Sequence, residues 1–154
     1  MVEFALVLPV FLLMLLGMLT GGIAFDRKLN ITAAARETAR YGATLPLSAH
    51  GGAVDPWLDA VATIAIDSAD GALDAGTSGR RVCVAYIGGG VSRVRDEVGA
   101  SVTTSDGTCF ADGRPAGEVR IQVVTERTSE LEAMLWSRTL NLTADAVSRY
   151  EATP

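Results

Sequence analysis

Hydrophobic residues are concentrated at the start of this 154-residue chain. Residues 4–25 read FALVLPVFLLMLLGMLTGGIAF, in which Thr20 is the only polar residue. A helix needs about 20 such residues to cross a bilayer, so the pattern predicts a transmembrane helix over residues 1–25. A buried core helix is usually shorter and has a polar face, and a signal peptide has a shorter apolar region behind a basic start. Pro9 and the glycines of this stretch are tolerated inside membrane helices.

The following stretch is rich in alanine, which predicts that the same helix continues over residues 26–44. It contains no helix breaker before Gly42 and Pro46. We expect a thin apolar stripe on this half to dock on a domain, with a charged face opposite. The stripe is formed by Leu29, Ala33, Ala39 and Ala43, and the charged face by Arg36, Glu37 and Arg40.

A second amphipathic helix is predicted from residue 55 to about residue 72, between loops at 46–52 and 71–79. Asp55 is placed to cap its N-terminus, and Pro56 suits the first helical position. Its apolar face consists of Trp57, Leu58, Val61, Ile64, Ala65 and Ser68.

Strand signals begin at residue 81. Residues 81–87 form a β-branched run that ends in three glycines, which indicate a turn, and residues 91–104 form a weaker, more polar candidate. Residues 118–127 alternate as a half-buried strand. The inward positions are Val119, Ile121 and Val123, and the outward positions are Arg120 and Gln122.

The last part of the chain predicts a helical turn and a strand. Ser129 and Glu132 form a capping box for a short helical turn over residues 129–136. Residues 138–151 alternate as a terminal antiparallel strand. Leu140, Leu142, Ala144 and Ala146 share one face of that strand, and Asn141, Thr143 and Asp145 share the other.

Together these elements predict an α+β protein with one transmembrane helix. The helix extends into a small head that contains a three- or four-stranded antiparallel sheet. We expect two parts, a transmembrane helix over residues 1–25 and a head over residues 26–154, with the helix of 26–44 continuous with the span.

Composition and charge exclude two classes of protein. About half of the chain is hydrophobic (49%), which excludes intrinsic disorder. Its 13 Lys and Arg against 18 Asp and Glu leave a net charge of −5, so no basic excess is available to bind nucleic acid.

The sequence contains no pattern of residues that predicts catalysis, a metal site or a cofactor. His50 is the only histidine, and it lies in a Gly-rich loop without a neighbouring nucleophile or acid pair. Cys83 and Cys109 have neither zinc-ligand nor CxxC spacing. Both fall in turn-rich sequence that we take to be exposed, and we favour a disulfide on an oxidising side of a membrane. Two unlinked thiols are the alternative.

Glu3 is the most informative single residue, because it stands at the mouth of the apolar segment. An acid in a membrane helix suggests a functional site, whereas the simpler interpretation places Glu3 in the lipid interface. Arg27 and Lys28 follow the helix and no basic residue precedes it, so the positive-inside rule alone would put the head in the cytoplasm. A basic leader upstream of Met1 would reverse that balance.

The N-terminal string VEFALVLPVFLLMLLGML (2–19), followed by AARETARYGAT (34–44), resembles the TadE-like proteins, pilin-like components of tight-adherence (Tad) pilus systems. The closing NLTADAVSRYE (141–151) is similar to the last strand of that family. The resemblance implies a minor pilin or pseudopilin that helps to initiate, prime or cap a Tad-type pilus, which is related to type IV pili. Cell adhesion would follow from such a pilus.

The resemblance also implies partners, a location and assembly residues. Other pilins and platform proteins would contact the N-terminal helix at Glu3, Phe4, Leu6 and Pro9. Glu3 would neutralise the N-terminal amine of a neighbouring subunit. A prepilin peptidase would remove a leader, and the helix would anchor the protein in membrane lipid with the head outside the cell membrane.

This sequence departs from the pilin pattern in one respect. Pilin-type glutamates usually stand fifth after the cleavage site, whereas the acid here is third. Another function remains open: a membrane-tethered extracytoplasmic binding module, for which the helix would only be an anchor.

Overall fold

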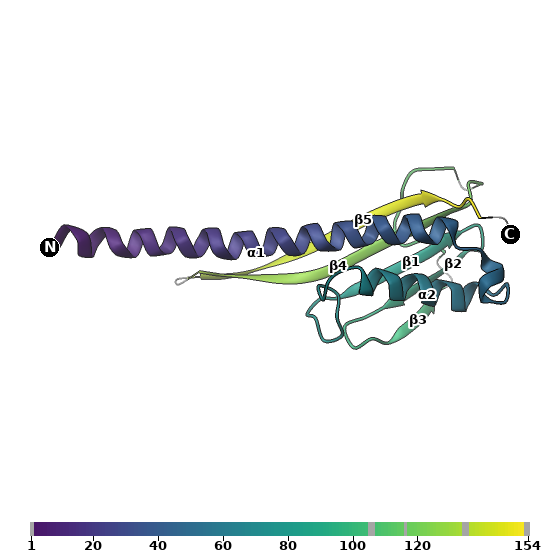
Figure 1. Cartoon of the computed structure of the whole chain (residues 1–154), viewed down its shortest axis with the longest axis horizontal. Coiled ribbons are helices and arrows are strands. Elements are labelled where there is room, and N and C mark those ends of the chain that lie inside the picture. Colours follow the sequence, from purple (N-terminus) through teal and green to yellow (C-terminus); the bar gives the residue numbers. More distant parts are fainter. Residues whose placement is uncertain (1, 105–106, 116, 134–135, 153–154) are drawn as a thin grey trace.

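A computed structural model describes residues 2–104, 107–115, 117–133 and 136–152. It contains one long helix and a five-stranded antiparallel sheet with strand order β3-β2-β1-β4-β5 (Figure 1). The predicted α+β class is therefore confirmed, with five strands in place of three or four. The elements are α1 (Val2–Thr44), the 3-10 helix η1 (Leu47–His50), α2 (Val54–Asp67), β1 (Arg81–Ile87), β2 (Val91–Arg95), β3 (Ser101–Thr104), β4 (Arg120–Ala133) and β5 (Trp136–Arg149).

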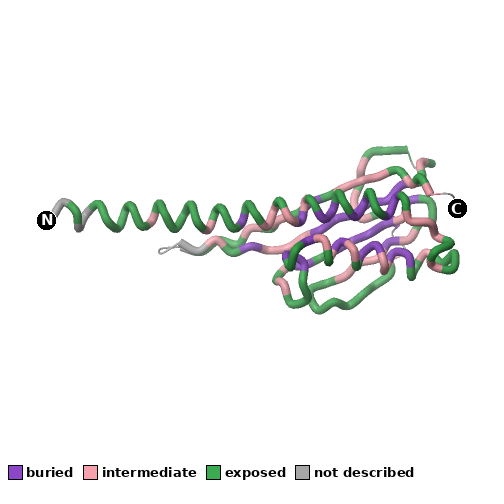
Figure 2. Tube along the Cα trace, viewed as in Figure 1, coloured by how far each residue is buried: buried purple, intermediate pink, exposed green. Residues whose placement is uncertain are grey.

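Helix α1 is continuous from the apolar segment into the head, as predicted. It is the one helix of the described residues that is long and apolar enough to cross a membrane, judged by length and composition. Its C-terminal half lies across the sheet, while its N-terminal half projects from the head (Figures 1 and 2).

The buried stripe of α1 differs in part from the predicted one. Ala39 and Ala43 are buried as expected, but Leu29 is 52% exposed and Ala33 is also exposed. Ile31, Ala34 and Ala35 take their place, together with Thr38. The buried face of the helix is rotated by about one residue from the predicted one. Alanines lie on both sides of the predicted stripe, so the sequence does not show which of them face the sheet.

Helix α2 is shorter than predicted and begins without the expected cap. Ala53 is the N-cap residue and provides no side-chain hydrogen bond, while Asp55 lies in the first turn. The helix ends at Asp67, because the chain then turns through Asp70 and Gly71, both of which have positive φ. Its buried face is Trp57, Leu58, Val61, Ala62 and Ala65, so Ala62 replaces the half-buried Ile64 in the predicted set.

Strand β1 spans the predicted residues 81–87, but the weaker candidate at 91–104 divides into two strands. Residues 96–100 turn the chain between β2 and β3, and the Asp96 carboxylate accepts hydrogen bonds from the amides of Val98 and Ala100. The sequence carried a signal for this turn in Asp96 and Gly99, but the β-branched residues on both sides of it were interpreted as one strand.

The short helical turn predicted over residues 129–136 is wrong. Residues 129–133 continue β4, and residue 136 begins β5, so that β4 and β5 pair from Arg120↔Arg149 to Ala133↔Trp136. Ser129 therefore caps no helix; its hydroxyl accepts a hydrogen bond from Arg27 Nη1 on α1. The neighbouring helix and the cross-strand partners outweigh the local helical preference of this stretch. The terminal strand, by contrast, is confirmed.

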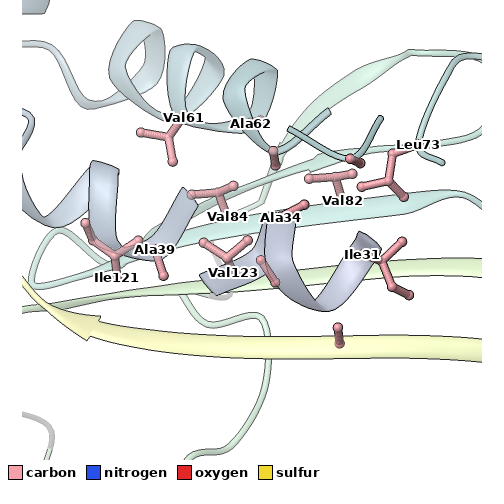
Figure 3. Packing of buried hydrophobic residues seen from close by; sticks show 14 of the residues in the cluster. Ile31, Ala34, Ala39, Val61, Ala62, Leu73, Val82, Val84, Ile121 and Val123 are labelled. Atoms are coloured by element: carbon pink, nitrogen blue, oxygen red, sulfur yellow. The ribbon is translucent and has the colours of Figure 1, made fainter. Parts of the chain in front are cut away.

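One face of the sheet is covered by α1 and α2 through apolar side chains. Val82 and Val84 of β1 and Val123 of β4 pack against Ala34 and Ala39 of α1 (Figure 3). Three aromatic rings close the end of this core, with Trp57, Tyr86 and Tyr150 in edge-to-face contact. Trp57 Nε1 and the Tyr150 hydroxyl both donate to the Leu45 carbonyl at the end of α1. This network fixes the C-terminal half of α1 in the head.

Candidate assembly surface

The opposite face of the sheet is covered by the loop between β3 and β4, and polar groups hold that loop. Arg120 and Gln122, predicted to point outward, lie on that face, yet Arg120 is only 4% exposed and Gln122 is fully buried. Gln122 Nε2 donates to the Phe110 carbonyl at 3.0 Å, and Gln122 Oε1 accepts from the Cys109 amide at 3.0 Å. Alternation thus identified the face correctly but not its burial, because a loop from elsewhere in the chain covers it.

An ion pair and a disulfide complete this loop attachment. Arg120 and Asp112 form a two-pronged pair, with Nε–Oδ2 at 2.7 Å and Nη2–Oδ1 at 2.9 Å. The hydrogen bonds from Arg120 and then Gln122 hold the pKa of Asp112 well below its ordinary value. Cys83 and Cys109 are joined by the disulfide that the sequence favoured. Cys83 is buried in β1, however, and not exposed in a turn as we expected.

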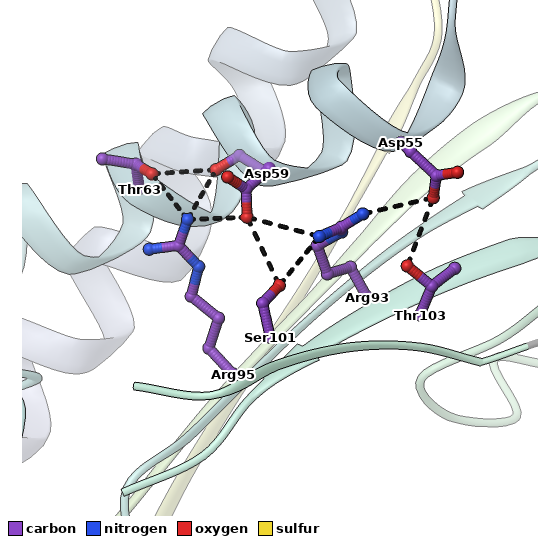
Figure 4. Close-up of polar contacts among 7 residues, drawn as sticks. All are labelled: Asp55, Asp59, Thr63, Arg93, Arg95, Ser101 and Thr103. Carbon is purple, nitrogen blue, oxygen red and sulfur yellow. Dashed lines mark hydrogen bonds and ion pairs between the residues drawn. The ribbon is translucent and has the colours of Figure 1, made fainter. Parts of the chain in front are cut away.

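A second polar cluster joins α2 to β2 and β3 (Figure 4). Asp59 Oδ1 accepts from Arg95 Nη2 at 2.7 Å, and Asp55 Oδ1 lies 3.2 Å from Arg93 Nη2. The Arg95 hydrogen bond lowers the pKa of Asp59, although partial burial acts in the opposite direction. These ion pairs fasten the helix to the sheet edge, although Arg93 Nε and Arg95 Nε are buried without a hydrogen-bond partner among the described residues.

Most of the exposed large hydrophobic residues that the structure describes lie in the N-terminal, apolar half of α1. Phe4 is 72% exposed, Leu19 62% and Phe25 65%, and most of the described residues of this half are exposed (Figure 2). So many large apolar side chains cannot face water at low cost, since each contributes about 1.5–3 kcal/mol when buried. This exposed apolar segment is suited to contact with lipid or with other apolar helices.

The four predicted assembly residues all lie at the start of this segment. Glu3, Phe4, Leu6 and Pro9 belong to the first turns of α1, and Pro9 lies inside the helix. Phe4 and Pro9 are exposed, whereas the side chains of Glu3 and Leu6 lie outside the described residues. Proline has no amide hydrogen, so Pro9 leaves the carbonyl four residues before it without its helical partner.

Two basic residues mark the end of the apolar segment, and both contact the β4–β5 hairpin. Arg27 Nη1 lies 3.2 Å from Ser129 Oγ, and Lys28 Nζ donates to the Thr143 carbonyl. Arg27 and Lys28, the basic residues that follow the apolar segment, therefore make hydrogen bonds to the head.

The apolar half and the first turns after it also carry a family signature. Residues 1–40 match the TadE-like protein family. This match confirms the predicted resemblance, and it suggests a pilin-like protein associated with a Tad pilus, a membrane and other pilus components. No curated protein and no solved structure matches the chain.

The TadE-like segment ends four residues before the end of α1. It includes the exposed apolar half, both basic residues and the buried stripe as far as Ala39. A structural role fits this segment, because the exposed residues of its apolar half are suited to packing. His50 lies beyond it in η1, and the described residues hold no group of three metal-ligating side chains.

Sequence reasoning missed the two polar clusters of the head. The signal for the first was present: Asp55 and Asp59 are four apart on a helix, and Arg93 and Arg95 are two apart on a strand, so each pair shares a face. The Asp112–Arg120 pair gave no comparable signal, because it depends on the path of a loop.

Proposed function

We propose that this chain is a membrane-anchored minor pilin or pseudopilin that helps to initiate, prime or cap a Tad-type pilus. The observation that carries the proposal is the coincidence of two features in residues 1–40. The TadE-like match covers this segment, and the same segment presents an exposed apolar helix that the head leaves uncovered.

In this proposal the chain has two parts. Residues 1–25 form a single transmembrane helix, and residues 26–154 form an extracytoplasmic pilin-like head into which α1 continues. The Cys83–Cys109 disulfide supports an oxidising location for the head, since such bonds persist outside the cytoplasm. A leader removed by a prepilin peptidase would account for the head lying outside despite Arg27 and Lys28.

Glu3 sets the register between subunits in this proposal. Its carboxylate pairs with the N-terminal amine of a neighbouring subunit, which lowers the cost of both charges in an apolar surrounding. Phe4, Leu6 and Pro9 supply the adjoining contact surface.

The test is to replace Glu3 by Gln or Leu in cells that assemble the pilus. We expect both variants to stay in the membrane, since the apolar segment is unchanged, and to abolish piliation and co-purification with pilins. Glu37→Gln, an exposed carboxylate in the outer half of α1, is the matched control and should leave assembly unchanged. Normal piliation of the Glu3 variants would contradict the proposal, and the tethered binding module would then be favoured if an unrelated span could replace residues 2–25.

A further inference from the structure

The β4–β5 hairpin reaches past the head along the apolar half of α1. Three contacts give the relative direction: Ile121 lies beside Gly42, Thr125 Oγ1 donates to the Ile31 carbonyl at 3.0 Å, and Ser129 accepts from Arg27. Each step along β4 therefore moves toward the N-terminus of α1. Figure 1 shows the hairpin running beside the helix in this direction.

The hairpin continues beyond the basic residues that mark the end of the apolar segment. From residue 129 to residue 133, β4 advances about 13 Å, the rise of roughly nine residues of helix. Ala24 of α1 is buried at 7% exposure and Thr20 is half-buried, although their neighbours in this half are exposed. The end of the hairpin thus lies level with the outer end of the proposed membrane span of α1, the part that approaches the headgroup layer.

The far part of the hairpin is covered on few sides by the rest of the chain. Strand β1 pairs with β4 only as far as Glu126, and β5 is the edge strand of the sheet. Isolated two-stranded hairpins are marginally stable in water. Beyond the sheet the hairpin has α1 as its neighbour, and Glu130 and residues 137–139 are exposed, so this part of the hairpin is open to contact from outside the chain.

The composition of the strand ends indicates which surroundings these are. Leu131, Ala133 and Trp136 are apolar, and tryptophan is typical of the boundary between lipid and water. Glu130 and Arg138 are exposed charges, and β5 is an edge strand, whose outer backbone groups have no strand partner among the described residues. Neither tolerates the hydrocarbon core, whereas the headgroup layer accommodates both.

We propose that the end of the hairpin, residues 130–133 and 136–139, is a second membrane contact that lies in the lipid headgroup layer beside α1. This inference rests on the proposed membrane anchoring of α1. The contact would hold the head at a fixed height and rotation relative to the bilayer, which a single helix cannot do.

Tryptophan fluorescence tests this contact directly, because the chain has only two tryptophans and Trp57 is fully buried in the head. The full-length Trp57→Phe variant, reconstituted in liposomes, would report on Trp136 alone. We expect lipids brominated close to the headgroup to quench its emission strongly, lipids brominated at the chain end to quench it less, and a maximum at shorter wavelength than in water. Aqueous iodide should have little effect.

The other outcomes overturn the inference. Quenching by iodide without quenching by brominated lipids would place the hairpin in water. Protection from both quenchers would mean that Trp136 is buried in protein, within this chain or against a second copy. Strongest quenching by chain-end bromines would contradict the headgroup depth. Trp136→Phe is the control, whose remaining Trp57 should respond to none of these quenchers; if Trp57→Phe fails to fold, the difference between this control and the unchanged chain gives the same measurement.

Alkaline extraction of the same liposomes separates this inference from the proposed function. A protein that resists extraction but shows no lipid quenching would refute the hairpin contact alone. A protein that is extracted would refute the membrane anchoring on which both proposals depend.

Discussion

The two faces of the sheet are covered in physically different ways. The face toward α1 and α2 is packed by apolar side chains such as Ile121 and Val123, whereas the opposite face is closed by a loop held through Cys109 and Asp112. Consecutive residues of β4 serve both faces: Ile121 enters the apolar core and Gln122 binds the loop. A single strand can therefore be buried on both sides by unlike chemistry.

The two faces should therefore differ in how their stability depends on pH and on redox state. Apolar burial scales with the area removed from water and responds little to pH or redox state. The loop-covered face rests on a covalent bond between thiols and on an ionised carboxylate, so it should respond to reduction and to acid.

Ile121→Ala should have the largest effect, because it empties the centre of the helix-covered face. Ile121 is fully buried and lies against Gly42 of α1. Loss of such a side chain costs about 2–5 kcal/mol of unfolding free energy. Chemical denaturation of the protein in detergent would measure it, with Val119→Ala, whose side chain is 39% exposed, as a control that should change little. Equal losses for both variants would show that the apolar core is not concentrated on this face.

Removal of the disulfide by Cys83→Ala with Cys109→Ala should have the next largest effect. The bond closes a loop across 26 residues of sequence separation, and loss of such a bond typically costs about 2–4 kcal/mol. We expect faster proteolysis within residues 107–119, with the α1 contacts unchanged. Reduction of the unchanged chain should reproduce the effect. If the double variant were cleaved first in the elements that pack against α1 and α2, the two faces would not be stabilised separately.

Acid should weaken the loop-covered face through Asp112. The pKa of this carboxyl is held by Arg120 well below its ordinary value of 3.8, so its ionised form stabilises the fold above that pH and the contribution is lost as the pH falls toward the folded value. The Asp112→Asn variant should have a lower free energy of unfolding than the unchanged chain at neutral pH. This difference in free energy should narrow as the pH falls below about 4.

Denaturation midpoints measured across that pH range would test this prediction. Asp59→Asn provides the comparison, since hydrogen bonding to Arg95 also lowers the pKa of Asp59 but its side chain is 43% exposed. Solvent screening should make the loss of unfolding free energy caused by Asp59→Asn smaller than that caused by Asp112→Asn. A loss for Asp112→Asn that is constant with pH would show that the Asp112–Arg120 pair contributes no acid sensitivity.

Sequence patterns predicted the elements whose signal is local. Residues 81–87 were placed correctly because a β-branched run ended in three glycines, and α1 was placed correctly because alanine-rich sequence followed an uninterrupted apolar segment. Residues 129–136 were misassigned because the local preference there is helical, while the observed strands are stabilised by α1 and by cross-strand pairs. The burial of Gln122 was missed for a related reason, since a loop that returns from residue 109 has no periodicity to detect.

The candidate surface was predictable to the same extent. Glu3, Phe4, Leu6 and Pro9 could be singled out because a family string contains them, and their position at the start of α1 follows from the apolar pattern. The length of the β4–β5 hairpin could not be predicted, because residues 129–136 have a local helical preference and their strand pairing depends on contacts with α1 and with each other.

The route by which α1 enters the head has a mechanical consequence. From Ala24 to Ala43, about 30 Å of helix lies along the sheet, and the Ala43 carbonyl accepts hydrogen bonds from the amides of Glu151 and Ala152 near the end of the chain. A pull along the helix axis would load all of these contacts in shear, so that they must break together and not one after another. Tension applied to the N-terminal segment would thus be spread across the whole head instead of peeling α1 away from one end.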